Sequence, residues 1–362
     1  MTPAPTTGPS IRVLILDDSA FMRTALSRII GSEAGMEVVG TAPSGTEALE
    51  RIPTLDPDVI TLDVEMPGLN GLQTLQRIMS KSPRPVIMVS SSSENGAGST
   101  FDALAAGAFD YVPKQLSAAS LDILHIRNDL VAKIRAAAAT RRPSTAGTFF
   151  RKQPQPAAPE LRDGVLPPPL IIALGCSTGG PKALQEILPT LPPDLAVPIL
   201  IVQHMPPGFT GPFAHRLNNL CSVTVRVAAH REILQPGVVY LAPSGTHMTV
   251  DRSSDPRGAL SLDPHPENCL HIPSVDIMMK SVALAFRSLA MGVILSGMGS
   301  DGAEGMMAIH RYGGLTIGQD EATCTVYGMP RACAELGALT RVVPLSQVAA
   351  QIVQASRSRR LA

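Results

Sequence analysis

Short apolar runs alternate with amphipathic stretches through the first third of the chain. In the first amphipathic stretch, Met22, Leu26, Ile29 and Ile30 recur at i, i+4, i+7 and i+8, the spacing of one helix face. A later stretch repeats this pattern. The alternation predicts a parallel sheet covered by helices on both faces, an α/β fold. The runs expected as strands are 12–16, 37–41, 59–62, 86–89 and 110–112.

The same alternation returns in the second half of the chain. There the apolar runs are separated by helical patterns, which predicts a second α/β domain with a mostly parallel sheet. The expected strands are 170–174, 198–202, 238–241, 293–295 and 315–317. The expected helices are 182–188, 211–220, 275–288 and 303–311.

The stretch between these two patterns has a different composition. Residues 136–169 contain seven prolines and scattered basic residues without apolar periodicity, which is typical of a flexible linker. A chain of 362 residues is also long enough for two domains. We therefore expect a first domain over 11–128, a linker over 136–169 and a second domain over 170–356.

The overall composition narrows the class of protein. With 44% hydrophobic and 17% charged residues, the chain can bury sizeable cores and is unlike a disordered sequence. Its 30 basic and 30 acidic residues cancel, so bulk charge gives no sign of nucleic acid or an anionic membrane as a partner. No apolar run reaches the roughly 18–20 residues of a membrane helix, and the N-terminus lacks the pattern of a secretory signal. The five cysteines show no CxxC spacing, which favours reduced thiols in the cytoplasm.

Carboxylates and a lysine stand where strands of the first domain are expected to end. Asp17 and Asp18 follow the first strand, Asp63 follows the third, Ser90 the fourth and Lys114 the fifth. The carboxyl ends of parallel strands share one edge of a sheet, so we expect these side chains to converge. Three carboxylates form a hard-oxygen site suited to Mg²⁺, and a carboxylate beside Mg²⁺ and a lysine can accept a phosphoryl group.

Each of these residues alone allows a simpler interpretation. Asp18 or Ser19 could cap the following helix, and Lys114 could be a solvated surface charge. The ordered combination over residues 11–125 resembles the receiver domain of two-component response regulators, a flavodoxin-like doubly wound parallel sheet. The chain departs from that resemblance at Gln115, where receivers usually have the proline that follows the lysine.

The receiver resemblance implies a role for each strand-end residue. It makes Asp63 the phosphorylated residue, and it implies that Asp17, Asp18 and Asp63 bind Mg²⁺. The residues that it assigns to sensing of the phosphoryl group are Ser90, Tyr111 and Lys114.

A glycine-rich turn follows the first expected strand of the second domain. Residues 175–179 read GCSTG, which fits the G-x-S-x-G elbow that exposes a serine, here Ser177, on a sharp strand-to-helix turn. The N-terminus of the next helix offers free N–H groups to an oxyanion. A phosphate-binding P-loop is disfavoured, because Pro181 precedes Lys182 and no hydroxyl residue follows the lysine. Cys176, inside the apolar run, is better explained as a small buried side chain.

A serine nucleophile needs a base, and the base needs an acid that orients it. His204 ends the second strand of this domain, so it is expected at the same sheet edge as Ser177, although a lone histidine there could also be structural. Asp301 lies in a further strand, turn and helix start, GVILSGMGSDGAEG, where capping that helix is the simpler interpretation. The chain order Ser, His, Asp differs from that of the familiar α/β-hydrolases, but order does not affect the geometry.

The second half of the chain also resembles a known family. The segments GCSTGGPKAL, VQHMPPGFTGPFAHRLN, LAPSGTHM, ILSGMGSDGAEGM and GQDEATCTVYGMPRA are similar to the catalytic domain of the chemotaxis protein-glutamate methylesterases, the CheB family. The resemblance implies Ser177 as nucleophile, His204 as base and Asp301 as the acid that orients it. The backbone N–H groups that it implies for the oxyanion hole are those of Thr178 and Met298.

This resemblance implies an enzyme activated by phosphorylation. It would hydrolyse glutamate γ-methyl esters on methyl-accepting chemotaxis receptors, release methanol, and also deamidate receptor glutamines. A histidine kinase of the chemotaxis type would be the phosphodonor. Mg²⁺ is implied for receiver phosphorylation and no cofactor for the esterase reaction. We further expect a cytoplasmic location, no nucleic-acid partner and no direct insertion into a membrane.

Two alternatives stay open from the residues alone. The serine elbow is also compatible with a receiver-regulated serine hydrolase that acts on a different ester or amide. The second domain could instead be a non-catalytic output domain that binds a partner. DNA is disfavoured as that partner, because no helix-turn-helix pattern is evident and the basic residues are scattered.

Overall fold

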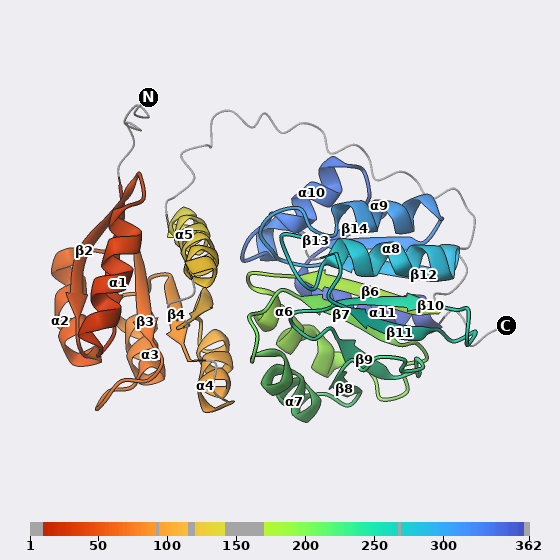
Figure 1. Cartoon of the computed structure of the whole chain (residues 1–362), viewed down its shortest axis with the longest axis horizontal. Coiled ribbons are helices and arrows are strands. Elements are labelled where there is room, and N and C mark those ends of the chain that lie inside the picture. Colours follow the sequence, from red (N-terminus) through yellow and green to blue (C-terminus); the bar gives the residue numbers. More distant parts are fainter. Residues whose placement is uncertain (1–9, 92–93, 115–119, 142–169, 267–268, 358–362) are drawn as a thin grey trace. The chain divides into compact units, whose positions relative to one another are not determined.

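The chain is described by a computed structural model, drawn in Figure 1. The structure describes residues 10–91, 94–114, 120–141, 170–266 and 269–357. The chain divides into two compact units, Met1–Phe150 and Arg151–Ala362. Each unit contains its own parallel sheet.

The first unit is built on a five-stranded sheet in the order β2-β1-β3-β4-β5. Every neighbouring pair of strands is parallel, so the predicted doubly wound α/β fold is confirmed. Strands β3 and β4 are buried along their whole length, which places the core on both sides of the central strands. The strands are β1 Ile11–Leu16, β2 Met36–Ala42, β3 Val59–Asp63, β4 Val86–Ser90 and β5 Asp110–Pro113.

Local signals start the helices of the first unit. The Ser19 side chain accepts the Met22 N–H at the start of the first helix, and Ser44 accepts the N–H of Glu47 at the start of the second. Ser19 therefore caps that helix, and Asp18 remains available to the strand-end cluster. The described helices are α1 Ala20–Gly31, α2 Gly45–Leu55, α3 Gly71–Lys81, α4 Glu94–Ala105 and α5 Ser120–Arg141.

Helix α5 continues further than the sequence pattern predicts. The expectation that a linker begins at residue 136 is wrong for residues 136–141, because the helix runs to Arg141 and buries Ala137 and Ala138. Alanine has the highest helix propensity, so this run forms a helix without a wide apolar stripe. The rest of the predicted linker, 142–169, lies outside the described residues.

The second unit contains a seven-stranded sheet in the order β14-β13-β12-β6-β7-β9-β8. All neighbouring strands are parallel, as predicted. Strand β6 lies in the middle, with β12 on one side and β7 on the other. The strands are β6 Ile171–Cys176, β7 Ile199–Gln203, β8 Thr224–Val227, β9 Val238–Leu241, β12 Ala290–Ile294, β13 Leu315–Gln319 and β14 Arg341–Val343.

Helices cover both faces of this sheet (Figure 1). The long helix α8 packs on β6 and β12, and its side chains Met278, Met279 and Val282 are fully buried in the core beneath it. A two-stranded antiparallel hairpin, β10 His247–Asp251 and β11 Ala259–Asp263, lies outside the main sheet. The described α-helices are α6 Gly180–Ile187, α7 Thr210–Leu220, α8 Val275–Phe286, α9 Ala303–Arg311, α10 Met329–Glu335 and α11 Leu345–Arg357.

The sequence pattern misses several elements of the second unit. Strands β8 and β14 are the two edges of the sheet, are short and are partly exposed, so they carry a weak apolar signal. The hairpin β10–β11 and the helices α10 and α11 are also missed. Strand β12 begins three residues earlier than the predicted 293–295, because Ala290, Met291 and Gly292 pair with β6 and are buried.

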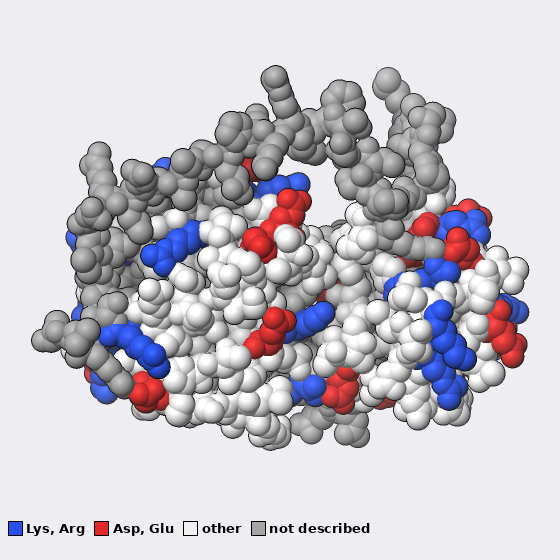
Figure 2. Space-filling model, turned by 180° about the vertical axis from the view of Figure 1, so that it is seen from behind, with Lys and Arg blue, Asp and Glu red and all other residues white. Residues whose placement is uncertain are grey.

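The surface of the described residues mixes charges of both signs. On the face drawn in Figure 2, basic and acidic side chains are interspersed, in keeping with the equal numbers of basic and acidic residues in the chain. Among the described helices, none combines the length and the apolar character that a membrane span requires.

Candidate phospho-acceptor and active sites

The predicted carboxylate cluster of the first unit comes together at the carboxyl ends of β1 and β3. Asp17, Asp18 and Asp63 each offer a carboxylate oxygen, and these atoms all lie within 4.8 Å of one another. Asp17 and Asp63 are fully buried, whereas Asp18 is exposed. Oxygen donors in this number and spacing, one of them open to solvent, fit the needs of Mg²⁺.

A lysine from the end of β5 contacts the same cluster. Lys114 Nζ lies 2.5 Å from Asp63 Oδ2 and 3.3 Å from Asp17 Oδ2. Burial raises the pKa of Asp63 to about 6, although hydrogen bonds from Lys114 and from the Glu65 N–H oppose that rise. Burial lowers the pKa of Lys114, but its bonds to the two carboxylates outweigh burial, so that its pKa is raised. The lysine is therefore a fixed positive charge beside Asp63.

The other two predicted sensing residues, Ser90 and Tyr111, lie on β4 and β5. Ser90 is fully buried at the end of β4 and accepts a hydrogen bond from Thr100 of α4 at 2.7 Å. Within the residues that the structure describes, no hydrogen bond joins Ser90 to Asp63. Tyr111 is buried on β5, and its ring meets Phe101 edge-on with 6.3 Å between the ring centroids. Burial raises the pKa of Tyr111 well above its usual value.

The predicted nucleophile of the second unit lies at the carboxyl end of the central strand. Ser177 follows β6 and is half-buried. The turn after it needs glycine at Gly179, which has φ +80° and whose Cβ would lie 2.5 Å from the side chain of Thr325. Cys176 is fully buried, and burial raises the pKa of its thiol far above the ordinary value, so it is a packed side chain as predicted.

The predicted base and acid contact each other directly. His204 follows β7, and its Nε2 lies 2.8 Å from Asp301 Oδ2. Asp301 also accepts hydrogen bonds from the Ser274 hydroxyl at 2.9 Å and from the N–H groups of Val275 and Asp276 at 2.8 and 2.9 Å. Burial alone would raise the pKa of Asp301, but its hydrogen bond and charge interaction with His204 and the two amides hold that pKa well below the ordinary value.

The capping interpretation of Asp301 is wrong for the helix that follows it. Gly302 is the N-cap residue of α9, and that helix has no side-chain cap. Asp301 instead accepts N–H groups in the first turn of α8, a helix that begins 26 residues earlier in the sequence, at Val275. The positive end of that helix favours a carboxylate at this position.

His204 makes one further contact through its ring and one through its backbone. The His271 ring stacks on it with 4.0 Å between the centroids and 18° between the planes. The backbone N–H of His204 donates a hydrogen bond to the Cys176 carbonyl at 3.1 Å. Nδ1 is buried and has no hydrogen-bond partner among the described residues, and no hydrogen bond joins the ring to the Ser177 hydroxyl in that part of the chain. In enzymes without substrate such contacts are often long.

The two backbone groups predicted for the oxyanion hole lie on loops next to the nucleophile. Thr178 directly follows Ser177 and is buried. Met298 follows Gly297, whose Cβ would lie only 3.0 Å from the Ser177 Cβ. The loop after β12 therefore packs against the nucleophile turn without an intervening side chain.

Three polar side chains that the sequence analysis does not single out bind these loops. Ser296 is buried, accepts the Val326 N–H and donates to the Thr178 carbonyl at 2.7 Å. Gln203 donates to the loops after β6 and β7. For Ser274 a signal was available, since it immediately precedes a helical pattern and caps α8.

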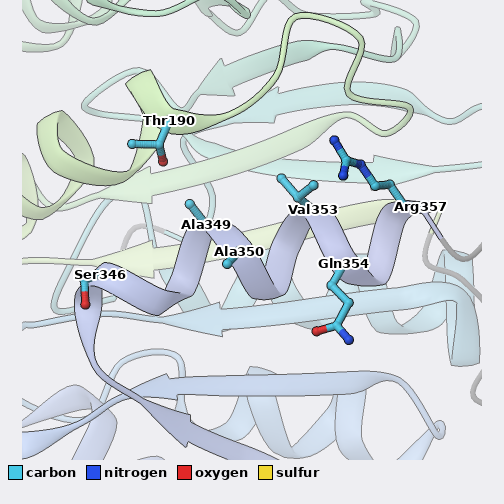
Figure 3. Close-up of a pocket in the computed structure, with 7 residues that line it drawn as sticks. All are labelled: Thr190, Ser346, Ala349, Ala350, Val353, Gln354 and Arg357. Atoms are coloured by element: carbon cyan, nitrogen blue, oxygen red, sulfur yellow. The ribbon is translucent and has the colours of Figure 1, made fainter.

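A separate hollow of about 710 Å³ lies along α11 (Figure 3). None of its lining residues is a predicted site residue. The side chains that line it are uncharged, apart from one arginine. The residues that line it are Thr190, Ser346, Ala349, Ala350, Val353, Gln354 and Arg357.

The fold and the two strand-end sites define a class of protein, a response regulator whose receiver-type unit precedes a second α/β unit with a Ser, His and Asp group at its sheet edge. Comparison with known families agrees with both halves. The response regulator receiver family matches residues 13–124, and the CheB methylesterase family matches residues 172–352. The chain belongs to the CheB methylesterase family.

Individual relatives support this membership along the chain. A protein-glutamate methylesterase/protein-glutamine glutaminase 1 of Oleidesulfovibrio alaskensis is 44% identical and covers 95% of this chain and 99% of its own length. A protein-glutamate methylesterase/protein-glutamine glutaminase of Pyrococcus abyssi is 42% identical over 97% of this chain and 95% of its own length. The crystal structure of the Thermotoga maritima CheB methylesterase catalytic domain is 36% identical with a TM-score of 0.50, covering 51% of this chain and 98% of that one.

Proposed function

We propose that this protein hydrolyses glutamate γ-methyl esters on methyl-accepting chemotaxis receptors and deamidates receptor glutamines, under control of its own receiver domain. The names of its relatives support the reaction class. The observation that carries the proposal is the 2.8 Å contact between His204 and Asp301 at the sheet edge where Ser177 follows β6.

The contacts of the His204 ring support separate roles for its two nitrogens in this proposal. Nε2 faces the Asp301 carboxylate, so this nitrogen carries the ring proton and donates a hydrogen bond to the carboxylate. Nδ1 is then the unprotonated nitrogen, and it has no partner among the described residues. We therefore assign Nδ1 as the base that accepts the proton of the Ser177 hydroxyl.

The reaction proceeds by acyl transfer to Ser177. Its oxygen attacks the γ-carbonyl carbon of the substrate while His204 Nδ1 takes the hydroxyl proton. The N–H groups of Thr178 and Met298 hydrogen-bond the resulting oxyanion. His204 then returns the proton to the leaving group, which departs as methanol from an ester or as ammonia from an amide. Water, deprotonated by His204, attacks the acyl-enzyme and releases glutamate and the free serine.

Regulation acts through Asp63 in this proposal. Its carboxylate accepts a phosphoryl group from a histidine kinase of the chemotaxis type. Asp17, Asp18 and Asp63 would hold Mg²⁺, which neutralises negative charge on the transferred group. Lys114, already 2.5 Å from Asp63, would pair with a phosphoryl oxygen, and Ser90 and Tyr111 would respond to it. Activation is then a population shift between an inactive and an active arrangement of the chain.

The domain boundaries and the location complete the proposal. We assign 11–128 to the receiver and 170–356 to the catalytic domain. Of the stretch 136–169 predicted as the linker, residues 136–141 belong to α5, which leaves 142–169 as the link between the domains. The location is cytoplasmic, where the kinase and the receptor methylation sites would be available. The esterase reaction needs no cofactor.

The test is release of labelled methanol from receptor that carries labelled methyl esters. With Mg²⁺ and a small phosphodonor, the wild type is expected to release methanol faster than without the donor. Ser177→Ala should lower the rate by about 10⁴-fold or more, whereas Ser222→Ala, at an exposed loop serine, should leave it unchanged.

Two results would contradict the proposal. Near-wild-type release by Ser177→Ala would exclude this serine as the nucleophile. Release from a simple ester but not from methylated receptor would identify a hydrolase of a different ester or amide.

A further inference from the structure

One buried side chain contacts both loops that carry the proposed nucleophile and base. Gln203 ends β7, is 3% exposed and pairs in register with Cys176 of β6. Its Nε2 donates to the Ser177 carbonyl at 3.0 Å and to the His204 carbonyl at 2.9 Å. A single amide therefore bridges the residue after β6 and the residue after β7.

The orientation of this amide is determined by its partners. Its Oε1 accepts the Cys176 thiol at 3.0 Å, while both N–H groups of Nε2 meet carbonyl oxygens. A flipped amide would place Oε1 against two carbonyl oxygens and remove the donor that Nε2 provides to each of them. The hydrogen-bonding capacity of the Gln203 amide nitrogen is therefore fully used in one arrangement.

The first residue of α6 packs directly on the same amide. A Cβ at Gly180 would lie 2.0 Å from Gln203 Oε1 and 2.9 Å from Cys176 Cβ. The Gly180 N–H also donates to the Ser177 carbonyl at 2.8 Å. That carbonyl is thus held from two sides, by the turn into α6 and by the amide from β7.

We propose that Gln203 is a positioning residue, which holds the Ser177 turn and the His204 loop at the separation that proton transfer requires. This inference rests on the function proposed above. Asp301 orients the ring of His204 but belongs to a third loop. Between the nucleophile and base loops themselves, the described hydrogen bonds are those of the Gln203 amide and the bond from the His204 N–H to Cys176. A displacement of about 1 Å between reacting groups can cost about 10²-fold in rate.

Two substitutions test this role in the full-length protein. Gln203→Met keeps the length of the side chain and removes every hydrogen bond of the amide. Gln203→Glu keeps the shape and, as a carboxylate, places an oxygen against both carbonyls. Each is expected to lower kcat on the order of 10–100-fold with KM within about threefold of wild type, because the buried Gln203 side chain acts through the two loops: the His204 carbonyl loses its described donor, and the Ser177 carbonyl keeps only the Gly180 N–H.

Gln185→Met is the matched control. Gln185 also makes hydrogen bonds from a partly buried position, to Pro181 and from Arg216, but has no described hydrogen bond to either loop. We expect wild-type kcat from it. Thermal unfolding of every variant shows whether the second unit is folded; if Gln203→Met does not fold, the result for Gln203→Glu decides.

The rate at which a serine-directed phosphonate labels Ser177 provides a second readout. It should fall in the Gln203 variants along with kcat. A folded Gln203 variant with kcat and labelling within twofold of wild type, or a loss confined to KM, would overturn the positioning role. Failure of the proposed function gives a different result: the wild type would label at Ser177 yet release no methanol from receptor, and the comparison of labelling rates would still decide the role of Gln203.

Discussion

Two aspartates, one at each of the two sites, have pKa values that are shifted in opposite directions from the ordinary value. Asp63 receives hydrogen bonds from Lys114 and from the Glu65 N–H and lies beside the carboxylate of Asp17, and burial raises its pKa to about 6. Asp301 is also largely buried, but its pKa lies well below the ordinary value. Burial is the largest single influence on both groups, so the difference comes from their partners.

The number and placement of donors separate the two sites. Asp301 accepts four hydrogen bonds, from His204, Ser274 and two N–H groups at the start of α8. These four hydrogen bonds stabilise its ionised form, which suits a group that stays ionised and orients a base. Asp63 accepts hydrogen bonds from two donors and lies beside the carboxylate of Asp17, so its ionised form is less well stabilised than that of Asp301. A bound cation beside Asp63, or loss of its own negative charge by reaction, is therefore favoured. Such an environment suits a carboxylate that binds beside a metal ion and is phosphorylated.

The largest expected effect comes from removing the charge of Asp301. Asp301→Asn keeps the size of the side chain but presents an amide to His204, which favours the wrong tautomer of the ring. We expect kcat for methanol release to fall by about 10⁴-fold, and by the same factor with and without phosphodonor. Asp276→Asn is not a clean control, because the Asp276 N–H donates to Asp301 and its carboxylate accepts the Gly305 N–H in the first turn of α9. Asp263→Asn, at an exposed position on β11, is suitable. A loss seen only without phosphodonor would show that Asp301 acts in regulation.

The second largest expected effect concerns Asp63 and the stimulation of activity by a phosphodonor. Asp63→Asn should abolish the rise in methanol release that a phosphodonor causes, because an amide cannot form the acyl phosphate, and should leave the rate without donor unchanged. The measurement is the ratio of rates with and without donor, in Mg²⁺. Glu50→Gln, at an exposed position on α2, should keep the wild-type ratio. Full stimulation of Asp63→Asn would place the phosphorylated residue elsewhere.

The sequence supports the main features of both sites because parallel strands bring distant residues to one edge. Asp17 follows β1 and Asp63 ends β3, while Ser177 and His204 follow β6 and β7. The periodicity that locates the strands therefore also brings each pair together. This argument does not require the exact strand boundaries.

The contacts made across the sheet edge could not be predicted in the same way. The approach of α8 to Asp301 depends on how a helix packs, and the stacking of His271 on His204 depends on the path of a loop. In the sequence, Gln203 is one polar residue at the end of an apolar run. The role that we propose for it depends on two carbonyls that only the folded structure places beside its amide. Such contacts follow from tertiary packing, which has no local sequence period.

A smaller effect tests how much each donor to Asp301 matters. Ser274→Ala removes one of its four hydrogen bonds and also the cap of α8. We expect the second unit to lose about 1 kcal/mol of stability and kcat to fall about tenfold or less. Ser281→Ala is the matched control, since that serine also bonds backbone in α8 but lies away from the acid. It should cost comparable stability with unchanged kcat. Equal loss of kcat in both variants would mean that the effect comes from destabilised α8 alone.

The smallest expected effect is on stability in acid. The folded pKa of Asp301 is below its ordinary value of 3.8, so the folded state binds this proton less readily than the unfolded state. Its contribution to stability is therefore complete above the unfolded pKa and is lost as the pH falls below it. Asp301→Asn cannot titrate, so its deficit in unfolding free energy relative to wild type should shrink by about 1 kcal/mol between pH 6 and pH 3. Calorimetric unfolding of the full chain at both pH values measures this. A deficit that is the same at both would mean that the four hydrogen bonds do not hold the acid ionised, and the contrast between Asp301 and Asp63 would then lose its electrostatic basis.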